Sequence, residues 1–289
     1  MAKITLIALP YDSGRPEERM GRGPVHLLEN GLAERLRENQ HDVEIRAVRL
    51  PEAFYSEGQG LVALQNLAVP IVREGIAGER RVLILSGNCG PAALSAAAAL
   101  NPRTTGVVWF DAHADFNTPD TSASGFLDGM SLAILVGRCW PALAARFVGF
   151  EPIPETNIVL VGTRNPDSLE ATALSESAIT IIPPTKMDAL ARAVEALSER
   201  VENFYVHLDV DVLDKSEGCA NSYASGGGIS ARALYAALEL LERSGRIRVA
   251  GITSYDPACD HNGSISKIIG NAATILGGRG IPLAATSLT

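Results

Sequence analysis

The chain has 289 residues, of which 46% are apolar and 20% charged, and its formal net charge is −8. These values are typical of a globular protein that is long enough to bury a sizeable core. The acidic balance argues against nucleic acid as a partner, because binding to phosphates requires a basic surface. No repeat, low-complexity tract or linker divides the sequence, so we expect a single domain over residues 1–289.

The hydrophobic segments and the cysteines favour a cytoplasmic protein. No stretch approaches the roughly 20 uninterrupted apolar residues of a membrane span, so we expect no membrane partner. The apolar run at 4–9 is too short for a signal peptide and predicts a first strand. The four cysteines, Cys89, Cys139, Cys219 and Cys259, are far apart in the sequence, which is typical of free thiols in a reducing compartment.

Short β-rich apolar runs alternate with helical stretches along the chain. Strands are predicted at 4–9, 43–48, 82–85, 107–111, 158–161, 179–182, 204–209 and 247–254. Helices are predicted at 24–39, 61–74, 91–100, 129–136, 166–176, 188–202, 231–244 and 264–276. Near-continuous hydrophobic strands joined by helices favour an α/β protein with a parallel sheet covered on both faces. Eight strand–helix pairs also fit a closed barrel, and periodicity does not separate the two.

Two acidic clusters follow predicted strands. Asp111, His113 and Asp115 follow the fourth strand, and Asp209 and Asp211 end the seventh. Because successive side chains of a strand point to opposite faces, residues two apart are expected on one side. Four carboxylates and an imidazole gathered at strand ends would repel one another and lose hydration without a cation. The sequence therefore predicts a metal centre.

The residue types favour a hard or borderline divalent ion. Carboxylates suit magnesium, calcium and manganese, and an imidazole extends the range to iron, nickel and zinc. Four aspartates and one histidine exceed the needs of one four-coordinate zinc, so we predict two ions about 3.5–4 Å apart with bridging aspartates. The alternative is that the acidic residues are solvated loop residues or helix caps. Solvation or capping explains a single aspartate better than it explains the two acidic motifs together.

The motifs resemble those of the arginase family, the ureohydrolases. The segment 111–115 is similar to the family's DAHxD motif, and 207–214, His-Leu-Asp-Val-Asp-Val-Leu-Asp, is similar to an SxDxDxxDP-like motif. Three further segments match family positions: 21–24 (Gly-Arg-Gly-Pro), 86–90 (Ser-Gly-Asn-Cys-Gly, where the family has GGDHS) and 161–164 (Val-Gly-Thr-Arg). The resemblance implies a three-layer α/β/α sandwich around an eight-stranded, mostly parallel sheet.

The resemblance also implies a binuclear hydrolase. It predicts two Mn²⁺ ions, with other divalent metals as alternatives, and a bridging hydroxide that attacks a guanidinium carbon. The implied metal ligands are Asp111, His113, Asp115, Asp209 and Asp211. Family members commonly form trimers or hexamers, so we expect a homo-oligomer.

Three further positions match groups that bind the amino-acid end of the substrate in this family. Asn117 and Ser124 match positions that bind an α-carboxylate, and Asp167 matches an acidic position that binds an α-amino group. An amide and a hydroxyl can donate to a carboxylate, and an aspartate can pair with an ammonium. The alternative is that Asn117 and Ser124 are turn residues and that Asp167 is a helix cap.

Three positions depart from the family pattern. Cys89 replaces a histidine metal ligand; a thiolate can bind metal, and a buried core cysteine is the alternative. Asp128 lies near the position of a proton-shuttling histidine and could donate a proton if its pKa were raised. We expect Asp115, Asp128 and His113 to take part in catalysis. Ser254 replaces a glutamate near the guanidinium.

The departures lie at the reactive end, whereas the amino-acid end is matched. We therefore expect a hydrolase of arginine or N-hydroxyarginine, a small-molecule guanidino amino acid. It would release urea or a substituted urea and an ornithine-like amine. Two alternatives stay open. One is a catalytically silent protein of the same fold that binds a ligand or scaffolds an assembly, and the other is a hydrolase of another amidine or amide.

Overall fold

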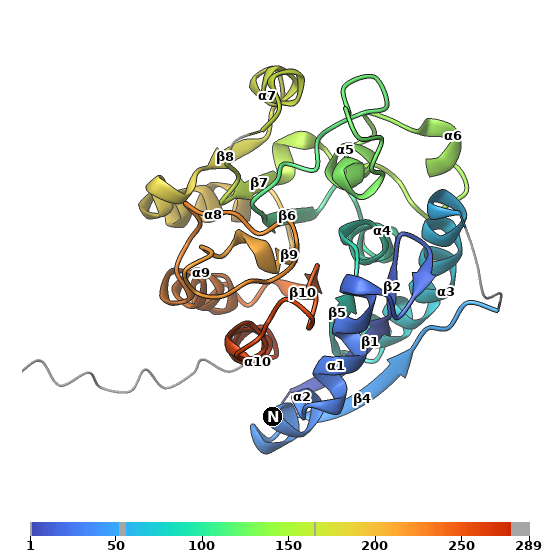
Figure 1. Ribbon diagram of the computed structural model, residues 1–289, viewed down its shortest axis with the longest axis vertical. Coiled ribbons are helices and arrows are strands. Elements are labelled where there is room, and N and C mark those ends of the chain that lie inside the picture. Colours follow the sequence, from blue (N-terminus) through green and yellow to red (C-terminus); the bar gives the residue numbers. More distant parts are fainter. Residues whose placement is uncertain (1, 52–55, 165, 279–289) are drawn as a thin grey trace, which may run out of the picture.

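An open sheet of eight parallel strands forms the centre of the molecule (Figure 1). The computed structural model describes residues 2–51, 56–164 and 166–278. The strand order is β4-β1-β5-β10-β9-β6-β7-β8. The strands are β1 (Lys3–Leu9), β4 (Asp42–Ala47), β5 (Arg81–Ser86), β6 (Thr105–Phe110), β7 (Ile158–Val161), β8 (Thr180–Ile182), β9 (Asn203–Asp209) and β10 (Ile247–Thr253).

The sheet order begins at β4 and ends at β8, so the sheet is open and the barrel alternative is wrong. All eight predicted strands are confirmed, each within two residues of its predicted bounds. A hairpin of β2 (Tyr11–Asp12) and β3 (Arg15–Pro16) was not predicted, because two-residue strands carry no periodic signal.

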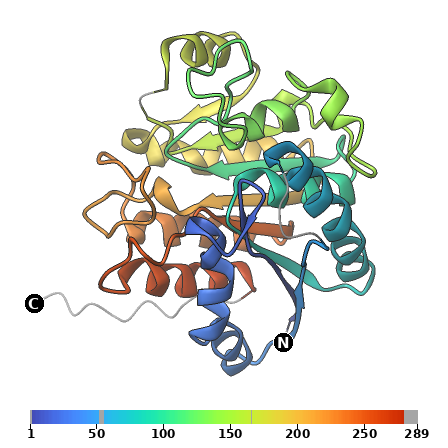
Figure 2. The same ribbon diagram turned by 45° about the vertical axis from the view of Figure 1, so that its right-hand side comes forward.

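Helices cover both faces of the sheet, so the predicted three-layer sandwich is confirmed (Figure 2). One layer contains α2 (Leu32–Glu38), α8 (Leu190–Ser198), α9 (Ala231–Arg243) and α10 (Ser264–Leu276). The other contains α3 (Glu57–Ala77), α4 (Cys89–Ala99) and α5 (Ser131–Leu135). Shorter elements are α1 (Gly23–Glu29), α6 (Pro141–Ala144), α7 (Ser168–Ser175) and the 3-10 turns η1 (Arg19–Arg22), η2 (Asp128–Met130), η3 (Glu155–Asn157), η4 (Pro184–Ala189) and η5 (Val210–Val212).

Alternate residues of strand β6 pack in two hydrophobic clusters, one on each face of the sheet. Val108 and Phe110 pack in the cluster under α9 and α10, whereas Val107 and Trp109 pack in the cluster under α3 and α4. All four side chains are fully buried. A strand buried on both faces needs apolar residues at every position, which explains the continuous hydrophobic run in the sequence.

The predicted helix at 24–39 is two helices, α1 and α2. Gly31 separates them with a φ of 85°, a left-handed conformation that glycine adopts at little cost. Within the part of the chain that the structure describes, none of the helices combines the length and apolar character needed for a membrane crossing.

Candidate metal centre and substrate cavity

A cavity of about 190 Å³ opens where the central strands end. Its wall brings together most of the site residues predicted from the sequence: Cys89, His113, Asp115, Asn117, Asp128, Asp167, Asp209 and Asp211. Asp111 is 1% exposed and lies behind this wall, where its Oδ1 accepts the backbone N–H of His113. Ser124 is exposed and is not part of the cavity wall.

The acidic motifs converge through turns, so our strand-alternation argument for their convergence was wrong. Strand β6 ends at Phe110, and the DAHxD motif lies in the loop after it. That loop turns sharply at Asp115, whose φ is 50°. Asp209 ends β9, and its Oδ1 accepts the N–H of Asp211 at 2.9 Å in the first turn of η5.

Burial of the four aspartates makes their ionised forms costly. Burial raises the pKa of Asp111 to about 6 and those of Asp115 and Asp209 well above the ordinary range. Burial would also raise the pKa of Asp211, but the hydrogen bond and charge of His113 outweigh it and lower that pKa. Burial opposes protonation of His113, and its bonds to Asp111 and Asp211 nonetheless raise its pKa to about 12.

These residues fit a bound divalent cation. The Oδ2 atom of Asp115 is buried and has no hydrogen-bond partner within the described chain. Of the basic side chains described, only His113 forms an ion pair with the four aspartates; its Nδ1 lies 3.5 Å from Asp111 Oδ1 and 3.4 Å from Asp211 Oδ2. A single partly exposed imidazole does not balance four buried carboxylates, whereas divalent ions would.

The possible ligand atoms form two groups that share Asp111. Asp111, His113 and Asp211 form one group, and Cys89, Asp111 and His207 form the other; within each group the atoms lie within 4.8 Å of one another. A carboxylate shared by two groups is the arrangement expected of a bridging ligand. The geometry therefore accommodates two ions.

Cys89 lies at the first residue of α4 and is 2% exposed. Its Sγ donates to Asp209 Oδ2 at 3.1 Å and lies 3.3 Å from Thr253 Oγ1. Gly87 lets the chain that leads to Cys89 pass close to Tyr11, because a Cβ at position 87 would lie 2.2 Å from the carbonyl oxygen of Tyr11. Burial, and then the charge of Asp209, raises the pKa of the Cys89 thiol well above its ordinary value. Without a cation, the thiol is therefore neutral.

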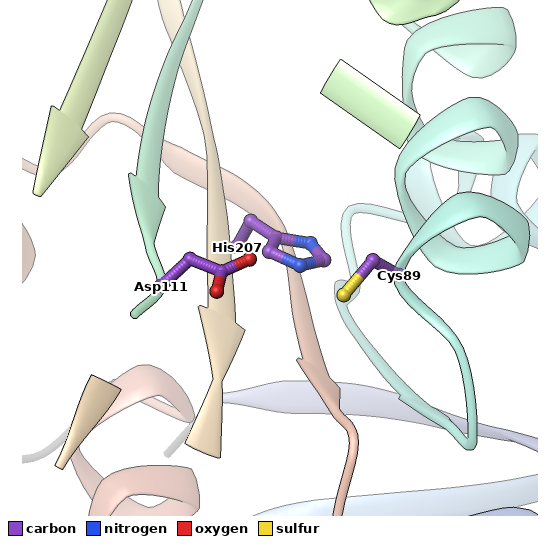
Figure 3. Close-up of side chains that lie close together, drawn as sticks. All are labelled: Cys89, Asp111 and His207. Carbon is purple, nitrogen blue, oxygen red and sulfur yellow. The ribbon is translucent and has the colours of Figure 1, made fainter. Parts of the chain in front are cut away.

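His207 lies behind the cavity wall and is fully buried. Its ring stacks on Trp109 with centroids 3.7 Å apart, and Tyr205 Oη lies 2.8 Å from its Nδ1. Burial lowers the pKa of His207 to about 3, so the imidazole is neutral. Figure 3 shows its ring between Asp111 and Cys89.

Each carboxylate oxygen of Asp128 accepts two hydrogen bonds. Its Oδ1 accepts from Gly90 N–H and Ser131 Oγ, both at 3.0 Å. Its Oδ2 accepts from Cys89 N–H at 3.1 Å and from Asn88 Nδ2 at 2.9 Å. Burial raises the pKa of Asp128, and these four donors oppose that rise. Asp128 thus satisfies the first N–H groups of α4 and fixes the backbone of Cys89.

The amino-acid end of the predicted site is only partly assembled. Thr121 Oγ1 donates to Asn117 Oδ1 at 2.9 Å. This contact occupies the amide oxygen and leaves the amide NH₂ to donate to a carboxylate. Asp167 precedes α7 and is exposed at the cavity, without a side-chain cap bond. Ser124 Oγ accepts from Phe126 N–H at 3.2 Å, a local turn contact.

Sequence reasoning missed several polar residues of the cavity wall, among them Glu170 and Arg164. Glu170 is buried, and its Oε1 accepts Phe116 N–H at 3.0 Å. Its spacing from Asp167, D-x-x-E at a helix start, is a capping-box signal that could have identified it. Arg164 donates to six backbone carbonyls, those of Gly162, Asp211, Val212, Leu213, Ser225 and Gly226. Arg164 therefore connects the turn that follows Asp211 to the glycine-rich segment at 225–228.

Ser254 lies in the cavity wall. Its hydroxyl donates to Asp209 Oδ2, and its backbone is left-handed with φ 64°. Asp256 and Asp260 follow Ser254 closely in the sequence, but neither is part of the cavity wall, so neither supplies a carboxylate there. Asp260 accepts the N–H groups of Ile265 and Ser266 and so caps α10.

Comparison with known proteins agrees with this geometry. A family model described as "Arginase family" matches residues 2–276. The arginase of Bacillus caldovelox is 30% identical over 286 residues, covering 93% of this chain and 95% of that protein. The arginase of Staphylococcus aureus strain COL is 30% identical over 279 residues, covering 90% and 91%.

Solved structures agree as well. The native structure of Bacillus caldovelox arginase at pH 5.6 has a TM-score of 0.86 at 26% identity, covering 96% of this chain and 99% of that one. The arginase structure from Bacillus subtilis has a TM-score of 0.85 at 26% identity with the same coverage. The chain therefore belongs to the arginase family, whose members are binuclear metal-dependent hydrolases acting on linear amidine C–N bonds.

Proposed function

We propose that this chain hydrolyses the guanidino group of an arginine-like α-amino acid and releases urea, or a substituted urea, and an ornithine-like amine. The observation that carries the proposal is one cavity whose wall contains both five of the six proposed metal donors and the polar groups Asn117 and Asp167. Asp167 would pair with the substrate ammonium, and the Asn117 amide would donate to its carboxylate. Ser124 as a third contact stays a prediction.

We further propose two manganese ions, held by Cys89, Asp111, His113, Asp115, Asp209 and Asp211. When bound, such ions lower the pKa of water enough for attack near neutral pH. Asp115 would accept a proton from the attacking water, a role that its buried Oδ2, which has no hydrogen-bond partner in the described chain, supports. His113, 47% exposed at the cavity, would help to hold that water. Asp128 as donor to the leaving amine stays a prediction.

N-hydroxyarginine is the substrate that we favour over arginine. Ser254 places a neutral hydroxyl beside Asp209 where a carboxylate would balance a guanidinium. An N-hydroxyguanidine is less basic than a guanidine, so it needs less negative charge beside it. The absence of an acidic group at position 254 therefore favours the less basic substrate.

We also propose that the protein is a cytoplasmic homo-oligomer, a trimer or hexamer, with a single catalytic domain. The four free cysteines support a reducing compartment.

The test of the proposed function is metal analysis followed by a substrate panel. We expect about two ions per chain after manganese loading. Release of urea from arginine, or of hydroxyurea from N-hydroxyarginine, should follow, with the larger kcat/KM for N-hydroxyarginine. Agmatine, which lacks the carboxylate, should be poor. Metal binding without turnover of any guanidine contradicts the proposal and supports a silent ligand-binding protein or a hydrolase of another amide.

Replacement of Cys89 by Ser tests its place in the metal centre. The change removes a sulfur donor at nearly constant volume, so we expect a lower metal content per chain and a lower kcat. The buried Cys139, which is remote from the acidic motifs in the sequence, provides the matched control as Cys139→Ser. Unchanged metal content and rate in Cys89→Ser would assign Cys89 to the core.

A further inference from the structure

The second donor group contains a histidine that the acidic motifs do not include. His207 lies on β9 two residues before Asp209, and Cys89 lies opposite it at the start of α4. Cys89 Sγ, an Asp111 carboxylate oxygen and a ring nitrogen of His207 lie within 4.8 Å of one another, and all three residues are buried. Figure 3 shows the three side chains pointing toward one another from separate elements.

The surroundings of His207 orient its ring. Tyr205 Oη engages Nδ1 at 2.8 Å, while Nε2 faces Thr253 Oγ1 at the longer distance of 3.4 Å. The ring is also held flat against Trp109. Histidines that bind metal generally have one ring nitrogen fixed by a hydrogen bond and the other directed at the ion. The Tyr205 contact supplies the first half of that arrangement.

The partner ligand is oriented from the same side. Trp109 Nε1 donates to Asp111 Oδ2 at 3.0 Å, so one indole contacts both Asp111 and His207. The Thr253 hydroxyl lies 3.3 Å from Cys89 Sγ, an ordinary distance for a contact with sulfur, and 3.4 Å from His207 Nε2, which is long for a hydrogen bond to nitrogen. A cation between sulfur and Nε2 would give Nε2 a stronger partner than this hydroxyl, and would replace the proton that Sγ donates to Asp209.

We propose that His207 is a metal ligand, and that with Cys89 and Asp111 it forms a buried sulfur–nitrogen–oxygen site that selects a borderline ion such as zinc over manganese. Zinc accepts thiolate, imidazole and carboxylate ligands in four-coordinate sites, whereas manganese favours oxygen. The group of Asp111, His113 and Asp211 is richer in oxygen and is the one that suits manganese. The two positions of the centre would then differ in metal preference. The inference rests on the proposed metal centre and not on the proposed substrate.

The experiment is a zinc and manganese titration of the metal-free protein against a chromophoric chelator, without substrate. The main variant is His207→Asn, whose amide can still bond to Tyr205 but which has no atom in place of Nε2. We expect its zinc affinity to fall by at least about tenfold, the lower limit for loss of even a supporting group. Its affinity for manganese at the group of Asp111, His113 and Asp211, which lacks His207, should be unchanged. Cobalt added to the wild type should show thiolate-to-metal absorption that Cys89→Ser loses.

Two further variants separate ligation from packing. Thr253→Val keeps the side-chain shape, so its zinc affinity should match the wild type; a loss equal to that of His207→Asn would mean that His207 acts through Thr253, and would overturn the proposal. His207→Ser provides a second test should His207→Asn fail to fold, as judged by circular dichroism. Unchanged zinc affinity in a folded His207 variant also overturns it. Guanidino hydrolysis that persists in that case leaves the proposed function intact.

Discussion

Asp209→Asn is expected to abolish manganese binding and to reduce kcat by about 10³-fold or more. Asp209 is buried, and its Oδ2 is the atom on which Cys89 and Ser254 converge. Asparagine keeps the shape and can still accept the N–H of Asp211 at Oδ1, but it removes the carboxylate that we propose as a metal ligand. A metal ion contributes several kcal/mol of transition-state stabilisation, and each 1.36 kcal/mol is worth about tenfold in rate.

Thermal unfolding with and without manganese checks this expectation independently of activity. Manganese at about 100 times its Kd should stabilise the wild type by about 2.7 kcal/mol, or roughly 5 °C in Tm. Asp209→Asn should lose this increment. Its metal-free form should be at least as stable as the wild type, because an amide carries no buried charge. Asp120→Asn, at an exposed position, is the control. A manganese-dependent Tm increase in Asp209→Asn would remove Asp209 from the ligand set.

The layered fold could be predicted because each strand carries its own signal. Strand β6 is buried on both faces, so its apolar run is continuous, and in α9 the buried residues Leu234, Ala237, Leu238 and Leu241 recur at helical spacing. Local backbone exceptions escaped prediction. The break at Gly31 depends on a positive φ within an otherwise helical pattern, and the turn between β2 and β3 is held by Asn88, whose Oδ1 accepts the N–H of Ser13.

The site was predictable to the extent that its residues are close in sequence. Asp111, His113 and Asp115 are neighbours in the chain, and their spacing indicated their chemistry. His207 begins the second motif, but its place beside Cys89 depends on the packing of α4 over β9 and β10, which no local pattern encodes. The role of Asp128 was also hidden, because its four donors come from segments some forty residues earlier and from the next turn.

Asp128→Ala is expected to lower the free energy of unfolding by about 2–6 kcal/mol and to weaken metal binding. The change removes the acceptor for two backbone N–H groups, those of Cys89 and Gly90. Each buried donor left without a partner costs about 1–3 kcal/mol. Because Cys89 is one of these residues, its thiol should lose its fixed position. A decrease in Tm of several degrees and a higher metal Kd would measure the two effects.

Asp128→Asn separates this positioning role from proton donation. The amide oxygen can replace only one of the two carboxylate oxygens. The amide NH₂ then faces Asn88 Nδ2 and the N–H of Cys89, which donate to Oδ2 in the wild type. We therefore expect a smaller loss of stability than in Asp128→Ala and a kcat that falls together with metal affinity. A general acid must be protonated, so its rate contribution is lost as pH rises through its pKa. If Asp128 only positions Cys89, saturating metal should restore most of the kcat of Asp128→Asn, with the wild-type pH profile. A fall of about 10²–10⁴-fold that metal does not restore, with loss of the alkaline limb, would instead assign Asp128 as the donor to the leaving amine.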